Sequence, residues 1–264
     1  MAEWAGRTAL ITGASYGLGE AFARRLAADG AHLILTARSR ERMESLAQEL
    51  RERHRVNITI ITADLAQPIA AEEIFRETTR LKLPVDLLIN NAGFGAVGNF
   101  SRLPLTRQLE MIQVNVSALV TLSHLYLPEM IERRAGAILN VASTAAFQAV
   151  PYFAIYAATK AFVLSFSEAL WAESQPHGVR VLALCPGPTA TNFQQVAGTA
   201  ARRAPEKMQT AEEVVSVGLK ALAQGRSHVV SGFGNRVQTE VERFLPRDVV
   251  TRIVTRVFRR FSTQ

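Results

Sequence analysis

The chain has 264 residues but only one cysteine, Cys185, and five histidines. A single thiol cannot form an intrachain disulfide or a cysteine-rich zinc site. We predict no bound metal, because no metal-ligand spacing relates the histidines, which are His32, His54, His124, His177 and His228. Cys185 follows an apolar run, so we expect it to be buried and inert.

Long apolar runs are lacking as well. The longest candidate, residues 109–131, is interrupted by polar residues such as Glu110, Asn115 and Glu129. It therefore cannot supply the roughly 18 unbroken apolar residues of a membrane span. The N-terminus has no basic segment followed by an apolar core, so we expect no secretory signal. With a single cysteine, these absences favour a reducing, cytoplasmic location.

Acidic residues are outnumbered, with 23 Asp and Glu against 30 Lys and Arg, which gives a net charge of +7. The excess is concentrated after residue 235, where seven Arg accompany three acidic residues. A basic segment can attract nucleic acid or an anionic membrane. No nucleic-acid recognition motif accompanies this one, so we expect no nucleic-acid partner. The simplest interpretation is a solvated helix face.

Strand-like and helix-like stretches alternate along most of the chain. Apolar, β-branched runs predict buried strands at 8–12, 32–37, 58–63, 85–90, 137–142 and 179–184, with a further candidate at 228–231. Amphipathic stretches predict helices at 19–28, 41–53, 71–81, 109–132, 155–174 and 210–223. Continuous apolar strands that alternate with helices indicate an α/β fold, a doubly wound parallel sheet with helices on both faces.

No linker interrupts this alternation, so we predict one domain at 1–235, followed by a basic amphipathic helical extension at 236–264. Residues 188–205 are rich in Thr, Ala, Gln and Gly, and we interpret them as a mobile segment, a candidate lid. Thr210 is expected to cap the next helix, with Glu212 and Glu213 in its first turn.

A glycine-rich turn separates the first predicted strand from the first helix. Glycines let the backbone approach a pyrophosphate closely, and the helix N-terminus offers free N–H groups to the anion. A glycine cluster alone is weak evidence, but this position between a strand and a helix makes it specific. The turn predicts a dinucleotide site that includes Gly13, Ser15, Tyr16, Gly17, Leu18 and Gly19.

The second strand is followed by Arg38 rather than by an acidic residue. An acidic side chain there would bind the ribose 2′-hydroxyl of NAD, whereas a guanidinium suits a 2′-phosphate. We therefore predict a preference for NADP(H), with NAD(H) as the less favoured cofactor. The alternative is that Arg38 only stacks on adenine or caps a helix. We also expect cofactor contacts just after the third and fourth strands, at Asp64, Leu65, Asn91, Ala92 and Gly93.

Tyr156 and Lys160 are four residues apart, so they share one face of a predicted helix. A free phenol titrates near ~10 and is a poor acid and base at neutral pH. A neighbouring ammonium favours the phenolate and lowers that pKa. The pair can then donate and accept a proton, and the nearby Ser143 can hydrogen-bond the same substrate oxygen.

Together these features resemble the short-chain dehydrogenase/reductase family, in an NADP-preferring, bacterial-type branch, over about residues 7–234. The resemblance rests on the 12–19 turn, Asp64, 90–93, Asn115, Ser143, Tyr156 with Lys160, and Pro186-Gly187 with Thr191. It implies a single Rossmann-type domain with a seven-stranded parallel sheet. It also implies assembly as a homodimer or homotetramer, with 109–132 and 155–174 as candidate interface helices.

The resemblance also implies residue roles. Tyr156 would exchange the proton with the substrate oxygen, Ser143 would polarise that oxygen, and Lys160 would bind the nicotinamide ribose and lower the Tyr156 pKa. Asn115 would hold a water that links Lys160 to solvent. Beside the nicotinamide would lie Pro186, Gly187, Thr189 and Thr191. Thr189 departs from the aliphatic residue that many members of the family carry.

The expected substrate residues are mostly aromatic: Phe94, Phe147, Gln148, Phe153 and Phe193. No Lys or Arg is placed to bind a substrate carboxylate, so we expect an apolar ketone, aldehyde or alcohol. Core packing is the alternative for each Phe. The functional prediction is an NADP(H)-dependent carbonyl–alcohol oxidoreductase, and its alternative is a catalytically silent cofactor-sensing or scaffold protein.

Apolar residues from Val249 to Phe261 recur at spacings of three and four, with Arg252, Arg256, Arg259 and Arg260 around them. Three interpretations of this predicted helix remain open. It docks on its own domain or a sister subunit, it lies on an anionic membrane surface, or it is frayed and unimportant.

Overall fold

The structure is a computed structural model that describes residues 3–191, 193, 197 and 208–259. Its seven strands form one parallel sheet in the order β3-β2-β1-β4-β5-β6-β7. Their bounds are β1 Thr8–Thr12, β2 His32–Ala37, β3 Ile58–Thr62, β4 Leu87–Asn90, β5 Gly136–Val141, β6 Val179–Cys185 and β7 His228–Val230. The predicted seven-stranded α/β sheet is confirmed. Strand order reverses between β1 and β4, where such sheets bind ligands at the carboxyl ends of their strands.

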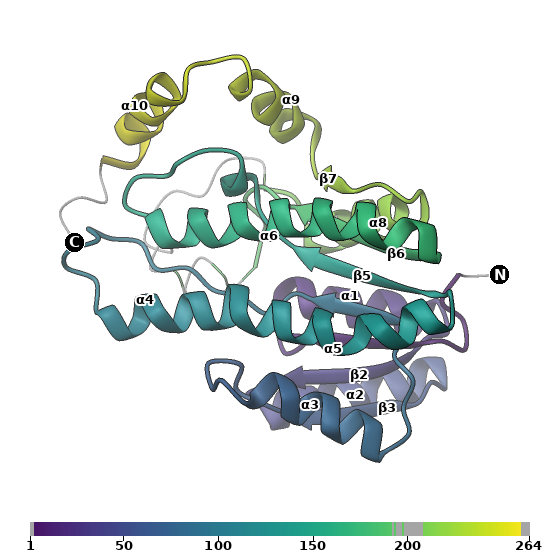
Figure 1. The fold of residues 1–264 in the computed structure, drawn as a ribbon. Helices are drawn as coiled ribbons and strands as arrows, with labels where there is room; N and C mark the ends of the chain where they lie inside the picture. The colour runs from purple at the N-terminus through teal and green to yellow at the C-terminus, as the bar shows by residue number, and fades with distance from the viewer. Residues whose placement is uncertain (1–2, 192, 194–196, 198–207, 260–264) are drawn as a thin grey trace.

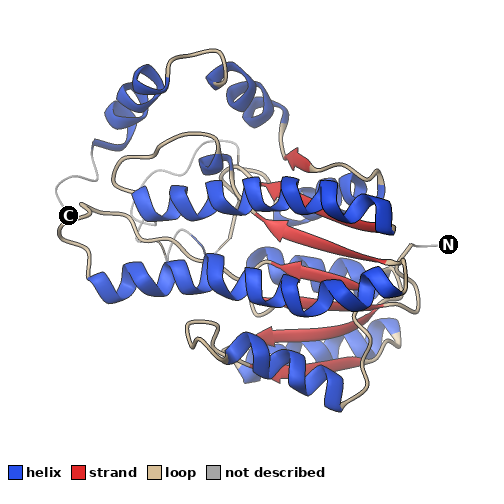
Figure 2. Ribbon diagram, in the orientation of Figure 1, coloured by secondary structure: helices blue, strands red, loops and turns tan. Residues whose placement is uncertain are grey.

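Helices cover both faces of the sheet (Figures 1 and 2). One layer holds α1 Gly17–Ala28, α2 Arg40–His54 and α8 Ala211–Ala223, and the other holds α3 Ala70–Arg80, α5 Ala118–Glu132 and α6 Ala154–Ser174. Successive residues of β1 serve the two layers in turn, because Ile11 packs with α1 and α8 while Leu10 packs with α3 and α5. This alternation explains why the strand is buried along its whole length and apolar at its three central residues.

The long helix predicted at 109–132 is three elements. Helix α4 begins earlier, at Leu105–Ile112, a π-helical turn η1 spans Gln113–Ser117, and α5 follows at Ala118. A π turn adds a residue to one helical turn without interrupting the helix. The apolar periodicity continues on both sides, so the sequence pattern does not reveal the insertion. The π turn carries Asn115, one of the predicted site residues.

Helix α8 begins as predicted. The Thr210 hydroxyl accepts from the Glu213 backbone N–H (3.2 Å), and the Glu213 carboxylate accepts from the Thr210 N–H (3.0 Å). This reciprocal capping box satisfies two backbone donors at the helix start. Most of the candidate lid at 188–205 lies outside the described residues.

The chain ends in two helices, α9 Phe233–Glu242 and α10 Arg247–Phe258, which we call the C-terminal arm. Figure 1 shows the arm arching past α6 at the β7 edge of the molecule. The predicted domain division after residue 235 falls inside α9, and the predicted Arg260 and Phe261 lie outside the described residues. Among the described helices, none has the length and apolar character needed to cross a membrane.

Candidate active site

Residues from three separate elements meet at the carboxyl edge of the sheet. Ser143 follows β5, Asn115 lies in η1, and Tyr156 and Lys160 lie in the first two turns of α6. Tyr156, Lys160 and Asn115 are 7%, 5% and 1% exposed. We call Asn115, Ser143, Tyr156 and Lys160 the Tyr156 cluster.

Lys160 is held by the sheet. Its Nζ donates to the Val141 carbonyl oxygen at the end of β5 (2.8 Å) and lies 5.8 Å from the centroid of the Tyr156 ring. A Cβ atom at Gly93 would lie 3.3 Å from this Nζ and 3.0 Å from Asn115 Oδ1. Gly93 therefore lets the loop after β4 approach both side chains closely.

Burial dominates the titration of this pair. It raises the pKa of the Tyr156 phenol to about 12, and the hydrogen bond with Ser143 offsets only part of that rise. Burial also lowers the pKa of the Lys160 ammonium to about 8. The sequence led us to expect a lowered phenol pKa, but here Lys160 Nζ donates to Val141 instead. At neutral pH the phenol keeps its proton, and it can act as a donor.

Asn115 connects three segments. Its Oδ1 accepts from Phe94 N (3.0 Å), and its Nδ2 donates to Phe94 O (3.0 Å) and to Thr159 Oγ1 (3.1 Å). Thr159 precedes Lys160 on α6, so the amide joins the π turn, the loop after β4 and the helix that carries Tyr156. Sequence reasoning missed Thr159, and its only signal was its position within the Tyr156–Lys160 stretch.

The glycine turn after β1 is tightly packed. Gly13 and Gly17 have φ of +66° and +56°, a region that L side chains rarely adopt. A Cβ atom at Gly19 would lie 2.2 Å from the Gly13 carbonyl oxygen. Asn91 braces the turn, because its Nδ2 donates to the Thr12 carbonyl oxygen (2.8 Å).

This turn fits a dinucleotide phosphate. Tyr16 is the N-cap of α1, and its side chain makes no capping hydrogen bond, so the first N–H groups of α1 stay available to an anion. Thr191 reaches this turn from the segment after β6, where its Cβ lies 3.1 Å from the position of a Cβ on Gly17. Leu18 and Ser15 belong to the same strand-to-helix turn.

Arg38 is exposed at the end of β2 and forms no ion pair with any described residue. Its neighbours are engaged: Arg40 Nε pairs with Glu44 Oε1 (2.7 Å), and the Arg42 guanidinium lies 4.0 Å above the Tyr16 ring. Arg38 is thus the cation at this edge that is left for a phosphate. At the end of β3, Asp64 Oδ1 accepts from Ala66 N (3.1 Å), and Leu65 is buried.

Aromatic rings cover Tyr156. Phe153 stacks on it with centroids 4.3 Å apart, and Phe193 is tilted against it at 5.4 Å. A Cβ atom at Gly95 would lie 2.6 Å from the Phe153 ring and 3.2 Å from that of Phe193. Gly95, which sequence reasoning missed, leaves the space that these rings fill.

The side chains of the other three predicted substrate residues contact groups other than the Tyr156 ring. The Phe94 ring packs under the Arg107 guanidinium (3.9 Å). Phe147 packs on the small core around Val163, with its ring 6.3 Å from that of His228. The Gln148 amide, oriented so that its nitrogen donates, reaches Glu242 Oε2 of α9 (2.6 Å). Adjacency in sequence to Ser143 therefore does not bring Phe147 and Gln148 to the Tyr156 ring.

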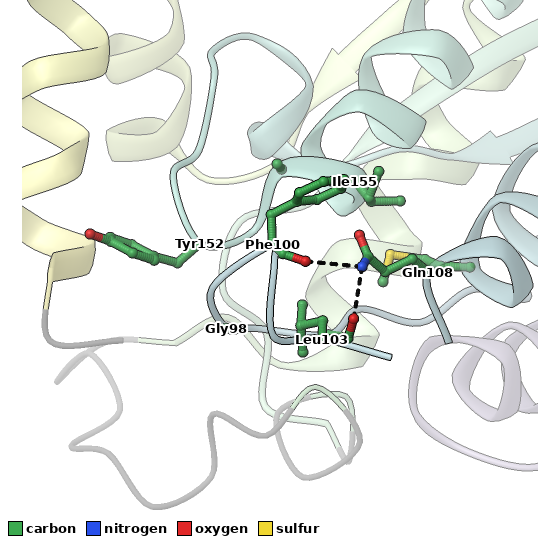
Figure 3. Close-up of a pocket in the computed structure, with 9 residues that line it drawn as sticks. Gly98, Phe100, Leu103, Gln108, Tyr152 and Ile155 are labelled. Atoms are coloured by element: carbon green, nitrogen blue, oxygen red, sulfur yellow. Dashed lines mark hydrogen bonds between the residues drawn. The ribbon is translucent and has the colours of Figure 1, made fainter. Parts of the chain in front are cut away.

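A small cavity of about 20 Å³ lies between the loop after β4 and the start of α6 (Figure 3). Gln108 lines it and donates from Nε2 to the carbonyl oxygens of Phe100 (3.2 Å) and Leu103 (3.0 Å). Neither Tyr156 nor Ser143 lines it. The residues that line the cavity are therefore not those of the Tyr156 cluster, and the Gln108 hydrogen bonds tie the loop at Phe100 and Leu103 to α4.

Known proteins are similar to this chain in sequence and in fold. The family model for short chain dehydrogenases matches residues 7–202. Chicken hydroxysteroid dehydrogenase-like protein 1 is 32% identical over 75% of this chain, which spans 60% of that relative's length. The very-long-chain 3-oxoacyl-CoA reductase of Anas platyrhynchos is 31% identical over 83% of this chain and 72% of its own. A human relative, inactive hydroxysteroid dehydrogenase-like protein 1, is 33% identical over 71% of this chain and 57% of its own.

Solved structures agree. A short-chain dehydrogenase from Sphingobium yanoikuyae in complex with NADPH has a TM-score of 0.79 and 33% identity, covering 85% of this chain and 86% of its own. A 7β-hydroxysteroid dehydrogenase has a TM-score of 0.87 and 28% identity, covering 96% of this chain and 98% of its own. The second match extends into the C-terminal arm, since the uncovered 4% of the chain is shorter than α9 and α10 together.

Proposed function

Because the chain belongs to the short-chain dehydrogenase/reductase family, we propose that it is an NADP(H)-dependent oxidoreductase that interconverts a carbonyl and an alcohol on an apolar substrate. One observation carries the proposal: Asn115, Ser143, Tyr156 and Lys160 converge at the carboxyl edge of a parallel sheet, next to a phosphate-binding turn.

In the proposed reduction, the Tyr156 hydroxyl donates its proton to the substrate oxygen. The Ser143 hydroxyl hydrogen-bonds the same oxygen and orients it. Lys160, with its pKa lowered to about 8, is a cation that can readily exchange protons near neutral pH. Asn115 fixes the helix and loop on either side. Residues of the 13–19 turn and Arg38 would hold NADP(H), which when bound supplies or accepts the hydride.

Tyr156→Phe tests this proposal, because it removes the proton and keeps the ring that stacks on Phe153. We expect kcat to fall by about 10²–10⁴, the usual contribution of a positioned acid or base. Turnover is followed by NADPH absorbance over a panel of ketones, aldehydes and alcohols. NADPH affinity, measured by fluorescence titration, serves as the control and should be retained. Wild-type turnover by the variant would refute the assignment.

The preference for NADP(H) over NAD(H) is supported by the guanidinium of Arg38, which is exposed and pairs with no carboxylate of the described residues. Arg38→Asp should weaken NADPH binding by about tenfold or more, because a charge-assisted contact to the 2′-phosphate becomes a repulsion, and should leave NADH binding much less affected. Arg40→Asp is the matched control, since Arg40 already pairs with Glu44. Equal losses for the two cofactors would argue against a 2′-phosphate contact.

An apolar substrate is supported by the Phe153 and Phe193 rings beside Tyr156, and by the steroid named for one structural neighbour. Among substrates of the panel, bulky apolar ketones should give a higher kcat/KM than small carboxylated ones. The reverse order would contradict the proposal.

A catalytically silent cofactor-binding protein is the second candidate, and the human relative named as inactive favours it. The retained Tyr156 cluster distinguishes the two candidates, because a silent protein has no chemical need for a buried phenol beside a buried ammonium. NADPH binding without turnover on any member of the panel would support the silent alternative.

We also propose assembly as a homodimer or homotetramer through the outer faces of α4 and α6. Leu109 and Ile112 of α4 and Phe162 of α6 are exposed apolar side chains at these faces. Light scattering on the purified chain gives its mass, and a monomer at micromolar concentration would contradict the proposal.

A further inference from the structure

The end of β7 and the first turn of α9 return to the carboxyl end of β6. Ser231 is fully buried there, and its N–H donates to the Cys185 carbonyl oxygen (3.2 Å). The Ser231 hydroxyl donates to Gln209 Oε1 (2.7 Å), and the Ser231 carbonyl oxygen accepts from Asn235 Nδ2 (2.8 Å). Ser231 therefore links Gln209, before α8, to Asn235, on α9.

Gln209 extends this connection to the segment after β6. Its carbonyl oxygen accepts from Ala190 N (3.0 Å), and it forms a parallel bridge with Thr189. Thr189 Oγ1 in turn donates to the Gly187 carbonyl oxygen (2.9 Å). We call Gln209, Ser231 and Asn235 the α9 brace, since their hydrogen bonds join α9 to residues 187–190.

The brace also touches Gly187 directly. A Cβ atom at Gly187 would lie 2.2 Å from Asn235 Nδ2 and 2.7 Å from its Oδ1. Gly232, with φ of +84°, approaches the same amide, with its Cβ position 2.9 Å from Nδ2. The Asn235 amide is held between two glycine backbones, so its position limits where the Pro186-Gly187 turn can move.

The two halves of the proposed cofactor site are therefore supported differently. The 13–19 turn, on the adenylate side, is held by Asn91, whose Nδ2 donates to the carbonyl oxygens of Thr12 (2.8 Å) and Gly13 (3.3 Å), all within the first 100 residues. Gly187, on the expected nicotinamide side, is packed against Asn235, and all three residues of the α9 brace lie beyond residue 202, where the family match ends.

We infer that the α9 brace positions residues 187–191 for the nicotinamide half of NADP(H), with Asn235 as the positioning residue. This inference rests on the proposed function. It gives α9 a role in cofactor binding through the backbone of Gly187, without contact to the reacting atoms.

Asn235→Ala in the full chain tests the inference by binding rather than by activity. We expect the NADPH dissociation constant to rise about tenfold, because the segment beside the nicotinamide loses its support. Adenosine 2′,5′-bisphosphate, which lacks the nicotinamide half, should bind the variant and the wild type equally. Asn235→Asp should behave like Asn235→Ala, because a carboxylate cannot donate to the Ser231 carbonyl oxygen.

Gln238→Ala is the matched control on α9 and should change neither affinity, because within the described part of the chain the Gln238 amide bonds only Glu242, at the surface (2.9 Å). Arg38→Ala should instead weaken both ligands, because both carry the 2′-phosphate. Unchanged NADPH affinity in Asn235→Ala would overturn the inference, and so would an equal loss for both ligands accompanied by a lower melting temperature. A wild-type chain that binds neither ligand would instead overturn the proposed function.

Discussion

The candidate active site and the C-terminal arm use similar residues in opposite environments. Phe153 stacks on a buried tyrosine, whereas Phe244, between α9 and α10, is 87% exposed. Gly19 has a backbone oxygen 2.2 Å from its Cβ position, whereas Gly234 in the arm has no atom within 4 Å of its own. The comparison teaches that residue type alone does not set the cost of a substitution. The packing around each residue does.

The largest contrast is expected between Gly19→Ala and Gly234→Ala. The first forces the glycine turn apart, and we expect a loss of about 2–3 kcal/mol in the free energy of unfolding together with loss of measurable NADPH binding. The second adds a methyl group in open space on a helix and should stabilise by up to about 1 kcal/mol or leave stability unchanged. Urea denaturation and NADPH titration measure both variants. Equal effects of the two substitutions on stability and on NADPH binding would contradict this expectation.

A second contrast compares Phe153→Ala with Phe244→Ala. Phe153 is partly buried against Tyr156, so its removal should cost about 1–2 kcal/mol, less than the ~3–5 kcal/mol of a fully buried Phe. It should also lower kcat, because the Tyr156 ring loses its stacking partner. Phe244→Ala should stay within about 0.5 kcal/mol. A larger loss for Phe244→Ala would show that the arm is buried in an assembly.

The titration of Lys160 sharpens the contrast with exposed lysines. Burial lowers its pKa from the ordinary 10.5 to about 8 in the folded chain, so between these values the unfolded chain binds more protons. Stability must then rise with pH in this window, by on the order of 1 kcal/mol from pH 7.5 to 9.

Lys160→Met should remove this rise, while Lys220→Met, at an exposed position on α8, should keep it. Burial raises the pKa of the Cys185 thiol to about 12, which opposes the rise at the upper end of the window, so each variant is compared with the parent chain in urea denaturation at each pH. An unchanged pH dependence in Lys160→Met would show that its ammonium is not buried.

The smallest effect on turnover is expected from deletion of the residues after Arg247. Val250 is buried while Val249, Ile253 and Val257 are exposed, which favours docking of α10 on protein, with an apolar strip left for a sister subunit. We expect kcat/KM within about twofold of the parent chain and a lower mass by light scattering. If the full chain floats with anionic vesicles and the truncated chain does not, the membrane interpretation would be supported instead.

The bounds of the strands were predictable to within a residue or two, because buried parallel strands are mostly apolar. Gly, Asn and Pro residues beside the apolar runs indicate where the strands end. The Tyr156–Lys160 pair was predictable because residues four apart lie on the same face of a helix. The π turn at Asn115 was not, because one inserted residue leaves the apolar pattern intact. Phe147 and Gln148 were placed by adjacency to Ser143, and the loop turns them toward His228 and Glu242 instead.

The sequence by itself determined the α/β class, the turn before α1 and the Tyr156–Lys160 pair with Ser143, because local periodicity and short spacings encode them, whereas Asn115 was implied only by the family resemblance. Only the tertiary structure decided the protonation of that cluster, since burial raises the pKa of Tyr156 and lowers that of Lys160, and burial is a property of the packed chain. The tertiary structure alone also places Asn235 against Gly187, which is 48 residues away in sequence. No local sequence pattern predicts this contact.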